Sequence, residues 1–264
     1  MDWEDPSALN ALDREGYRVV EALARDPSRG ESGTFSRPSP FVCIDGSIYW
    51  LKGNVDPGRV QQGLVAELIG GRLAAIVGAG PAAVVVRVTP ESLPSDGTAT
   101  HLLGVVVGIL DEPQVANARD LQATIANLGV PAPSIDGRSR ALVVAFQTWI
   151  GASDSQVLVR LTDGRVMSID HGDCFANVTS VGPPSMVVTP ILPGTEDVGR
   201  GAPEVQAAVA KIEAVTDQQI LRAVAQVPAG EAWQSPVDRR LAIARWLSHR
   251  RDSLRAVMDG WSTP

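Results

Sequence analysis

The chain has 264 residues, of which 44% are hydrophobic and 20% charged, and its formal net charge at pH 7 is −7. This composition is ordinary for a folded globular protein and argues against wholesale disorder. The acidic balance argues against a general binder of nucleic acid or anionic membrane, because neutralising phosphate groups requires a basic surface.

The first fifty residues contain an ambiguous segment, a loop and a hairpin. Residues 8–26 mix helical spacing with a short apolar run, which leaves helix and strand open. Residues 27–40 are rich in Pro, Gly and Ser, which is a loop composition. Two β-rich runs, 41–44 and 48–51, flank an Asp-Gly turn, the pattern typical of a β-hairpin. Lys52 ends the second strand.

A helix and two strands are expected next. The apolar residues of 58–77 recur on one face at helical spacing, and glycine and proline at 78–81 end the pattern. Residues 82–88 are valine-rich and almost wholly apolar, which favours a buried strand. Residues 102–110 favour another strand after a polar loop. The first 110 residues therefore predict a small lobe in which one helix packs on a sheet.

The next part of the chain combines helices with a second hairpin. Helical spacing runs through 112–128 and 137–150, and the second segment is strongly apolar. Two short strands, 157–159 and 166–169, flank an Asp-Gly turn and predict a hairpin.

The last third of the chain is expected to be loop and helix. Prolines and glycines predict a loop over 176–202, and amphipathic helices follow at 203–226 and 236–259. The overall prediction is an α+β fold of two lobes. A small β-rich lobe, with one helix, spans 1–110, and a larger, mostly helical lobe spans 111–264.

Lysine is rare in this chain, which contains only Lys52 and Lys211 and takes its other positive charges from arginine. Chance and a specific need for a compact ammonium group both account for a lysine at a strand end. Glu67 lies in the middle of the next predicted helix, beside Leu64 and Leu68, and can meet Lys52 across the sheet–helix interface. An exposed ion pair would be worth only about 0–1 kcal/mol, but the apolar neighbours place Glu67 near the buried face.

Two aspartates bracket the second predicted hairpin. Asp154 precedes its first strand, and Asp170 follows its second. Because a hairpin returns the chain to its starting point, both carboxylates are expected at the same open end. There one can accept a proton from an attacking hydroxyl while the other holds Mg²⁺. The alternative is that each aspartate merely caps a turn.

Five short segments support a family resemblance. They are SRGESG at 28–33, YWLK at 49–52, VAEL at 65–68, FQTWIG at 146–151 and SIDHG at 168–172. Their sequence and order resemble those of the HipA-like kinases, relatives of the toxin kinase HipA and, more distantly, of phosphatidylinositol 3/4-kinases. The resemblance extends over about residues 28–176, and residues 169–172 are its most specific element.

The resemblance implies a two-lobed protein-kinase-like fold with an ATP and Mg²⁺ site. Lys52 would contact the ATP phosphates and Glu67 would hold it in place. Asp154 would be the catalytic base, and Asp170 the principal Mg²⁺ ligand. The loop that would cover the phosphates with backbone amides contains Gly30, Ser32 and Gly33.

The catalytic loop departs from the family pattern. Residues 151–158 form a shortened loop without the basic partner of the aspartate, and Gln156 stands near the position of the metal-binding asparagine. Mg²⁺ demands near-ideal octahedral geometry, so a displaced ligand weakens binding. Three hypotheses remain: a kinase that phosphorylates Ser or Thr on a protein, itself included at Ser32; a pseudokinase that binds nucleotide or a protein partner; and a kinase-like fold with an empty cleft.

Smaller features complete the expectations. His171 can contact phosphate, act as a pH switch, or hydrogen-bond and orient the catalytic loop. The two cysteines, Cys43 and Cys174, are expected to be reduced and buried. The arginine-rich helix at 239–255 is either a solvated face or a surface that docks a partner or an acidic ligand. An acidic N-terminus without a signal-peptide pattern, and apolar runs too short to cross a membrane, predict a cytoplasmic protein.

Overall fold

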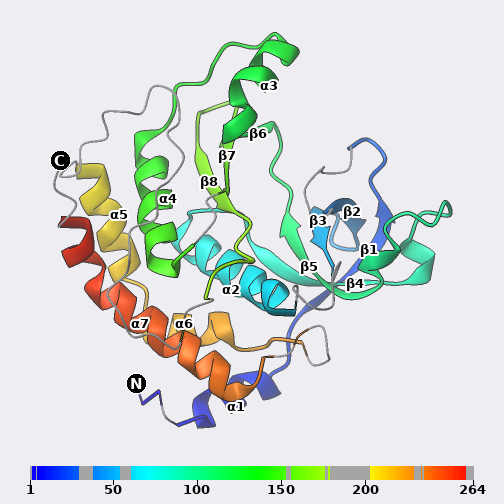
Figure 1. Cartoon of the computed structure of the whole chain (residues 1–264). Helices are drawn as coiled ribbons and strands as arrows, with labels where there is room; N and C mark the ends of the chain where they lie inside the picture. The colour runs from blue at the N-terminus through cyan, green and yellow to red at the C-terminus, as the bar shows by residue number, and fades with distance from the viewer. Residues whose placement is uncertain are drawn as a thin grey trace.

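A barrel of strands and a group of helices lie on opposite sides of a central helix, α2 (Gln61–Val77), in the computed structural model of the chain (Figure 1). The structure describes residues 2–3, 5–29, 38–53, 61–152, 156–175, 178, 203–228, 233 and 235–259.

The barrel consists of β1 (Val19–Arg25), β2 (Ser39–Cys43), β3 (Ile48–Lys52), β4 (Ala83–Val88) and β5 (Gly104–Leu110). Neighbouring strands follow the order β1-β2-β3-β5-β4, and a parallel pairing of β1 with β4 closes the ring. The predicted hairpin is confirmed as β2 and β3, and the sheet expected in this part of the chain is closed into a barrel. Alternating apolar side chains fill its interior: Val20, Ala22, Phe41, Cys43, Tyr49, Leu51, Val86, Val88 and Val106.

A second, three-stranded antiparallel sheet contains β6 (Val115–Asn117), β7 (Gln156–Arg160) and β8 (Val166–Ile169) in that order. The predicted second hairpin is confirmed as β7 and β8. The helical pattern predicted over 112–128 is wrong in its first half, where β6 pairs with β7. Only its second half is a helix, α3 (Leu121–Leu128). Pairing with a strand forty residues away determined the local structure, because strand formation depends strongly on tertiary context.

The remaining helices are α4 (Gly137–Ile150), α5 (Pro203–Glu213), α6 (Asp217–Val224) and α7 (Val237–Asp259). The single helix predicted over 203–226 is in fact α5 and α6. Within the described ranges no helix is long and apolar enough to cross a membrane. The loop predicted over 176–202 lies outside the described residues, apart from residue 178. Short 3₁₀ turns occupy Pro90–Ser92, Thr100–Leu102 and Ala118–Asp120.

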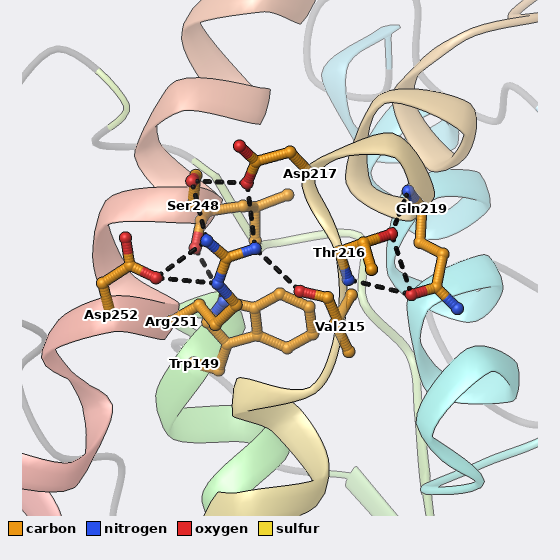
Figure 2. Close-up of polar contacts among 9 residues, drawn as sticks. Trp149, Val215, Thr216, Asp217, Gln219, Ser248, Arg251 and Asp252 are labelled. Carbon is orange, nitrogen blue, oxygen red and sulfur yellow. Dashed lines mark hydrogen bonds and ion pairs between the residues drawn. The ribbon is translucent and has the colours of Figure 1, made fainter. Parts of the chain in front are cut away.

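Polar contacts hold the start of α6 against α7, as Figure 2 shows. Thr216 and Gln219 form a capping box, in which the Thr216 hydroxyl accepts from the Gln219 N–H at 3.2 Å. Asp217 accepts from Arg251 at 2.9 Å and from Ser248 at 3.0 Å, both residues of α7. The cap begins a new helix at Asp217, which explains why α5 does not continue into α6.

The first helix, α1 (Ser7–Arg14), packs against α6 and α7. Arg240 of α7 donates to both carboxylate oxygens of Asp13, at 2.8 and 2.7 Å. The ambiguous segment 8–26 thus divides into this helix and β1. Residues 1–110 were expected to form one lobe, whereas α1 contacts α6 and α7, whose residues were expected in the other.

The central helix α2 is buried on every side along residues 64–71. The sequence predicted one apolar face, but the helix packs against β4 and β5 on one side and against α6 on the other. Two adjacent glycines permit this close packing. A Cβ at Gly70 would lie 2.4 Å from the Cβ of His171, and one at Gly71 would lie 2.4 Å from the Cβ of Ala83.

Arg72 joins the second half of α2 to the end of α6. Its guanidinium donates to the backbone carbonyls of Ala223, Ala225 and Gln226, at 3.1, 2.7 and 3.3 Å. These carbonyls lie where α6 ends and lacks further helical donors. Burial lowers the pKa of Arg72 to about 10, so the side chain remains charged at neutral pH.

Replacing Arg72 with methionine is expected to lower the free energy of unfolding by about 3 kcal/mol, because several buried carbonyls lose their donor. Urea denaturation checks this as a lower midpoint at an unchanged slope. Arg222→Met is the matched control: this arginine lies exposed on α6 and its loss should change stability by less than about 0.5 kcal/mol. Equal shifts for the two variants would contradict the assignment.

Candidate functional site

Three segments far apart in sequence converge on one ammonium group. Lys52 ends β3, Glu67 lies in the middle of α2, and Asp170 follows β8. Lys52 Nζ lies 2.9 Å from Glu67 Oε2 and 2.8 Å from Asp170 Oδ1. The predicted Lys52–Glu67 contact is therefore present, and Asp170 shares it.

The three charges differ in exposure. The side chains of Glu67, Lys52 and Asp170 are 2%, 12% and 28% exposed, respectively. Burial alone would lower the pKa of Lys52, but the two carboxylates outweigh burial and raise it. Burial alone would raise the pKa of Asp170, but the charge and hydrogen bond of Lys52 hold it below its usual value. Lys52 and Asp170 are accordingly both charged at neutral pH and stabilise each other's charged form.

The backbone around β8 determines where Asp170 lies. β8 pairs with β7 so that Ile169 faces Gln156. The Ser168 N–H donates to the carbonyl of Ala79 at 2.8 Å, which ties β8 to the end of α2. Asp170 then adopts a left-handed conformation with φ +59°. Such a conformation is uncommon for residues other than glycine, although aspartate tolerates it better than most. It turns the chain sharply at the point where the carboxylate meets Lys52.

His171 lies in the protein interior rather than in a cleft. It is 2% exposed, and burial lowers the pKa of its imidazole, so the ring is neutral at pH 7. Its Nε2 is 3.1 Å from Ser168 Oγ, and its ring meets that of Phe146 edge-on. This placement does not suit the phosphate contact considered from the sequence. The catalytic-loop segment that His171 was predicted to orient, residues 153–155, lies outside the described residues.

A cleft of about 380 Å³ opens beside Lys52 and Asp170. This volume is in the range typical of small-molecule sites. Its polar end contains Lys52, Asp170 and Gln156. Its walls are mainly apolar and come from both the barrel and the second sheet, which suits a flat heteroaromatic group. The apolar lining residues are Pro38, Trp50, Pro81, Ile109, Leu110, Val115, Leu158 and Ile169.

The far end of the cleft contains a polar cluster that sequence reasoning missed. Asp111, directly after β5, accepts hydrogen bonds from Trp50 Nε1 at 2.8 Å and from Arg29 Nη1 at 2.7 Å. All three residues line the cleft. No local pattern distinguished Asp111 from any other loop aspartate. The pairing of β3 with β5 brings it beside Trp50, and the turn after β1 brings Arg29 to it.

The predicted site residues fall into two groups. Lys52, Glu67 and Asp170 are brought together, and Gln156 lines the same cleft. Asp154 lies outside the described residues, as do Gly30, Ser32 and Gly33. The two cysteines are free and buried, and burial raises the pKa of Cys43 to about 12.

The donor set at the polar end of the cleft fits a hard divalent cation. Asp170 supplies a carboxylate, and Gln156 can supply an amide oxygen. Mg²⁺ prefers oxygen ligands and is commonly held by one or two carboxylates together with substrate phosphates. Within the described residues, no three His, Cys, Asp or Glu side chains are grouped as metal ligands.

Comparisons with solved structures place this architecture among kinases. The crystal structure of a Helicobacter pylori proinflammatory kinase, CtkA, matches with a TM-score of 0.52 and 12% sequence identity, over 92% of this chain and 98% of that chain. At this identity the match shows a kinase-like fold and nothing finer.

Two further similar structures are of Golgi casein kinase. The one with Mn/ADP bound has a TM-score of 0.42 over 96% of this chain and 75% of that chain, and the other has 0.36 over 94% and 74%. Both are 12% identical to this chain, and at these TM-scores neither bears on its fold. No family model matches the sequence, and no curated protein matches it.

Replacing Lys52 with methionine is expected to lower the free energy of unfolding by about 3 kcal/mol at pH 7, because it leaves two carboxylates without their cation. Without Lys52, burial raises the pKa of Asp170 above its unfolded value. The stability that protonated Asp170 contributes is present below that unfolded value and is lost as pH rises through the folded value. The loss in Lys52→Met should therefore be smaller near pH 4 than at pH 7.

Urea denaturation at the two pH values measures this difference. Lys211→Met is the matched control, since Lys211 is exposed and is the only other lysine. A loss that is independent of pH, or equal in the control, would contradict the account.

Proposed function

We propose that the chain is an ATP- and Mg²⁺-dependent kinase of the HipA-like type, which transfers the γ-phosphate to a Ser or Thr hydroxyl of a protein, itself included. The observation that carries the proposal is the position of Lys52. Its ammonium lies between Glu67 and Asp170 at one end of a cleft whose walls are mainly apolar. A cation next to mainly apolar walls suits a ligand with an aromatic base and a phosphate chain.

In this proposal Lys52 binds the phosphates and Glu67 holds Lys52. Glu67 is almost fully buried, so its carboxylate keeps the ammonium in one place. Charge-assisted hydrogen bonds of this kind are short and directional. When Lys52 turns towards phosphate oxygens, its bond to Asp170 is released and that to Glu67 is kept.

Asp170 and Gln156 would hold the cation. Their proximity across the β7–β8 ladder supports this assignment, because Gln156 pairs with Ile169, the residue before Asp170. When bound, Mg²⁺ neutralises the charge that develops on the transferred phosphoryl group. The release of Asp170 by Lys52 frees a carboxylate oxygen at the place where the cation is needed.

Asp154 is assigned to the acceptor hydroxyl. It lies between Gly151, which ends α4 in a left-handed conformation, and Gln156, which lines the cleft. A carboxylate there would accept the proton of the attacking Ser or Thr side chain. The partner is then a protein segment able to reach the cleft mouth.

A pseudokinase is the second candidate function. The segment 151–158 contains no basic residue to accompany Asp154, and glutamine replaces the asparagine of the family pattern. In this alternative Lys52, Glu67 and Asp170 bind the nucleotide, and the protein acts through a partner without phosphoryl transfer.

Nucleotide binding should stabilise the folded chain only when metal is present. At MgATP concentrations of a hundred times the Kd, the apparent stability is expected to rise by about 2.7 kcal/mol, measured as a higher Tm. Asp170→Asn should lose most of the metal-dependent part of this rise, because its amide no longer attracts a divalent cation. Asp173→Asn, an exposed neighbour, should behave as the unmodified protein does. If MgATP does not change the Tm, the proposal that the cleft binds nucleotide is wrong.

Phosphoryl transfer separates the two candidate functions. With radiolabelled ATP and Mg²⁺, the kinase is expected to label itself or a Ser/Thr peptide. Asp154→Asn should reduce the rate by about a hundredfold or more with little change in MgATP affinity, because a general base acts only on transfer. Asp163→Asn, in the exposed β7–β8 turn, is the control. MgATP binding without any labelling would identify the pseudokinase.

A further inference from the structure

A line of buried polar side chains runs behind the site. Gln147 of α4 donates from Nε2 to Ser168 Oγ of β8 at 3.1 Å, and Ser168 Oγ lies 3.1 Å from His171 Nε2. All three residues are at most 2% exposed. Buried polar groups are retained where their hydrogen bonds are satisfied, so the direction of each bond can be worked out.

The hydrogen bonds determine which nitrogen of His171 carries its proton. Ser168 Oγ accepts from Gln147, and within the described part of the chain its only other hydrogen-bond partner is His171 Nε2. The hydroxyl proton therefore points to Nε2, which must accept it. A neutral imidazole that accepts at Nε2 carries its hydrogen on Nδ1.

The Nδ1 atom faces Glu67. His171 Nδ1 and Glu67 Oε1 are 3.9 Å apart, and each is a buried polar atom without a hydrogen-bond partner in the described part of the chain. Glu67 uses its other oxygen, Oε2, for Lys52. The separation exceeds a hydrogen bond by about 1 Å. A donor and an acceptor thus face each other across a small gap, and neither has another partner among the described residues.

Packing holds the imidazole in this orientation. Gly70, one helical turn beyond Glu67, leaves space for the Cβ of His171, which a Cβ on residue 70 would approach to 2.4 Å. On another side, the Phe146 ring meets the imidazole edge-on, at 5.6 Å between centroids and 88° between planes. The ring cannot turn to present Nε2 to Glu67 without displacing one of these neighbours.

We propose that His171 is a positioning residue, whose Nδ1–H, oriented by Gln147 and Ser168, donates to Glu67 Oε1 and holds the carboxylate that fixes Lys52. In the nucleotide-free protein the Nδ1–H already faces Oε1 across 3.9 Å and attracts it electrostatically. The inference rests on the proposed function in one respect: this contact shortens to a hydrogen bond when Lys52 leaves Asp170 for a phosphate. Asp170 then no longer draws the Lys52 ammonium away from Glu67. A shift of about 1 Å brings its free oxygen within hydrogen-bonding distance of Nδ1–H.

Two isosteric substitutions separate this role from simple packing. The amide nitrogen of asparagine takes the place of the histidine Nδ1 and donates as it does. The longer side chain of glutamine brings its amide to the place of Nε2, where its carbonyl oxygen can accept the Ser168 hydroxyl proton. His171→Asn therefore keeps the donor to Glu67 and loses the contact with Ser168. His171→Gln keeps the contact with Ser168 and loses the donor to Glu67.

The MgATP affinities of the two variants should differ. His171→Gln is expected to bind MgATP about tenfold or more weakly than the unmodified protein, because a hydrogen bond to a charged group is lost. His171→Asn should remain within about threefold. A purely structural role predicts the opposite order, because the interior contact with Ser168 survives only in His171→Gln. Urea midpoints of both variants establish that they are folded.

A second measurement needs no nucleotide. Lys52 and Lys211 are the only lysines, so their acetylation rates can be compared within one sample by mass spectrometry. Loosening Glu67 lowers the pKa of Lys52 and exposes a more nucleophilic amine. The ratio of Lys52 to Lys211 acetylation is expected to rise several-fold in His171→Gln and to stay near that of the unmodified protein in His171→Asn.

The ¹⁵N shifts of the imidazole in the nucleotide-free protein test the tautomer directly, and a proton on Nε2 would overturn the proposal. Equal or reversed ratios of Lys52 to Lys211 acetylation in the two variants would overturn it as well. If the unmodified protein binds no MgATP, the proposed function fails. The acetylation ratio and the tautomer still decide the role of His171, so the two failures are distinguishable.

Discussion

The ammonium group of Lys52 joins three parts of the protein that the chain keeps far apart. It ends a barrel strand, and its partners Glu67 and Asp170 belong to the central helix and to the end of β8. Removing three charges from water is costly, and their mutual attraction offsets that cost only while all three are present and well oriented. The barrel, α2 and the second sheet are therefore coupled through one cation, and a displacement of any of them disturbs the other two.

The position of Glu67 depends in turn on how α2 is enclosed. A helix that is apolar on one face can slide or tilt on its support, but α2 is covered on all sides along residues 64–71. Gly70 and Gly71 allow neighbours to approach on two sides, and Arg72 attaches the helix to the carbonyls at the end of α6. Glu67 is consequently preorganised: its carboxylate lies where Lys52 needs it before any ligand arrives, which is the arrangement that electrostatic stabilisation requires.

The cleft combines two environments along its length. At one end are the charges of Lys52 and Asp170, and along the walls are apolar side chains from the barrel and from the second sheet. At the other end Asp111 draws Trp50 and Arg29 together at the point where the chain leaves the barrel. Because both sheets contribute to the walls, the shape of the cleft depends on their relative placement. The salt bridges of Lys52 and the tie from Ser168 to Ala79 maintain that placement.

Local sequence determined the elements whose causes are local. The Asp-Gly turns specify two hairpins, the apolar periodicity specifies α2 and α4, and the rarity of lysine with Glu67 in an apolar helix indicated the ion pair. The break before α6 was also visible, in the capping pattern of Thr216 and Gln219, although the helical periodicity across it concealed it. Asp170 at the end of a hairpin was correctly placed near the site for the same reason, since a hairpin fixes which residues lie at its open end.

Only the tertiary structure decided the rest. The parallel pairing of β1 with β4 closes the barrel, and the pairing of β6 with β7 makes a strand of a segment with helical spacing. Neither pairing is indicated by the residues close to it in sequence. Asp111, Gln147 and Ser168 resemble polar residues at many other positions, and their partners lie 21 to 82 residues away. Lys52 was recognisable from sequence because lysine is rare in this chain and this one ends a predicted strand. Its direct contact with Asp170, 118 residues away, was not recognisable, because no local pattern records which distant charges a fold brings within 3 Å.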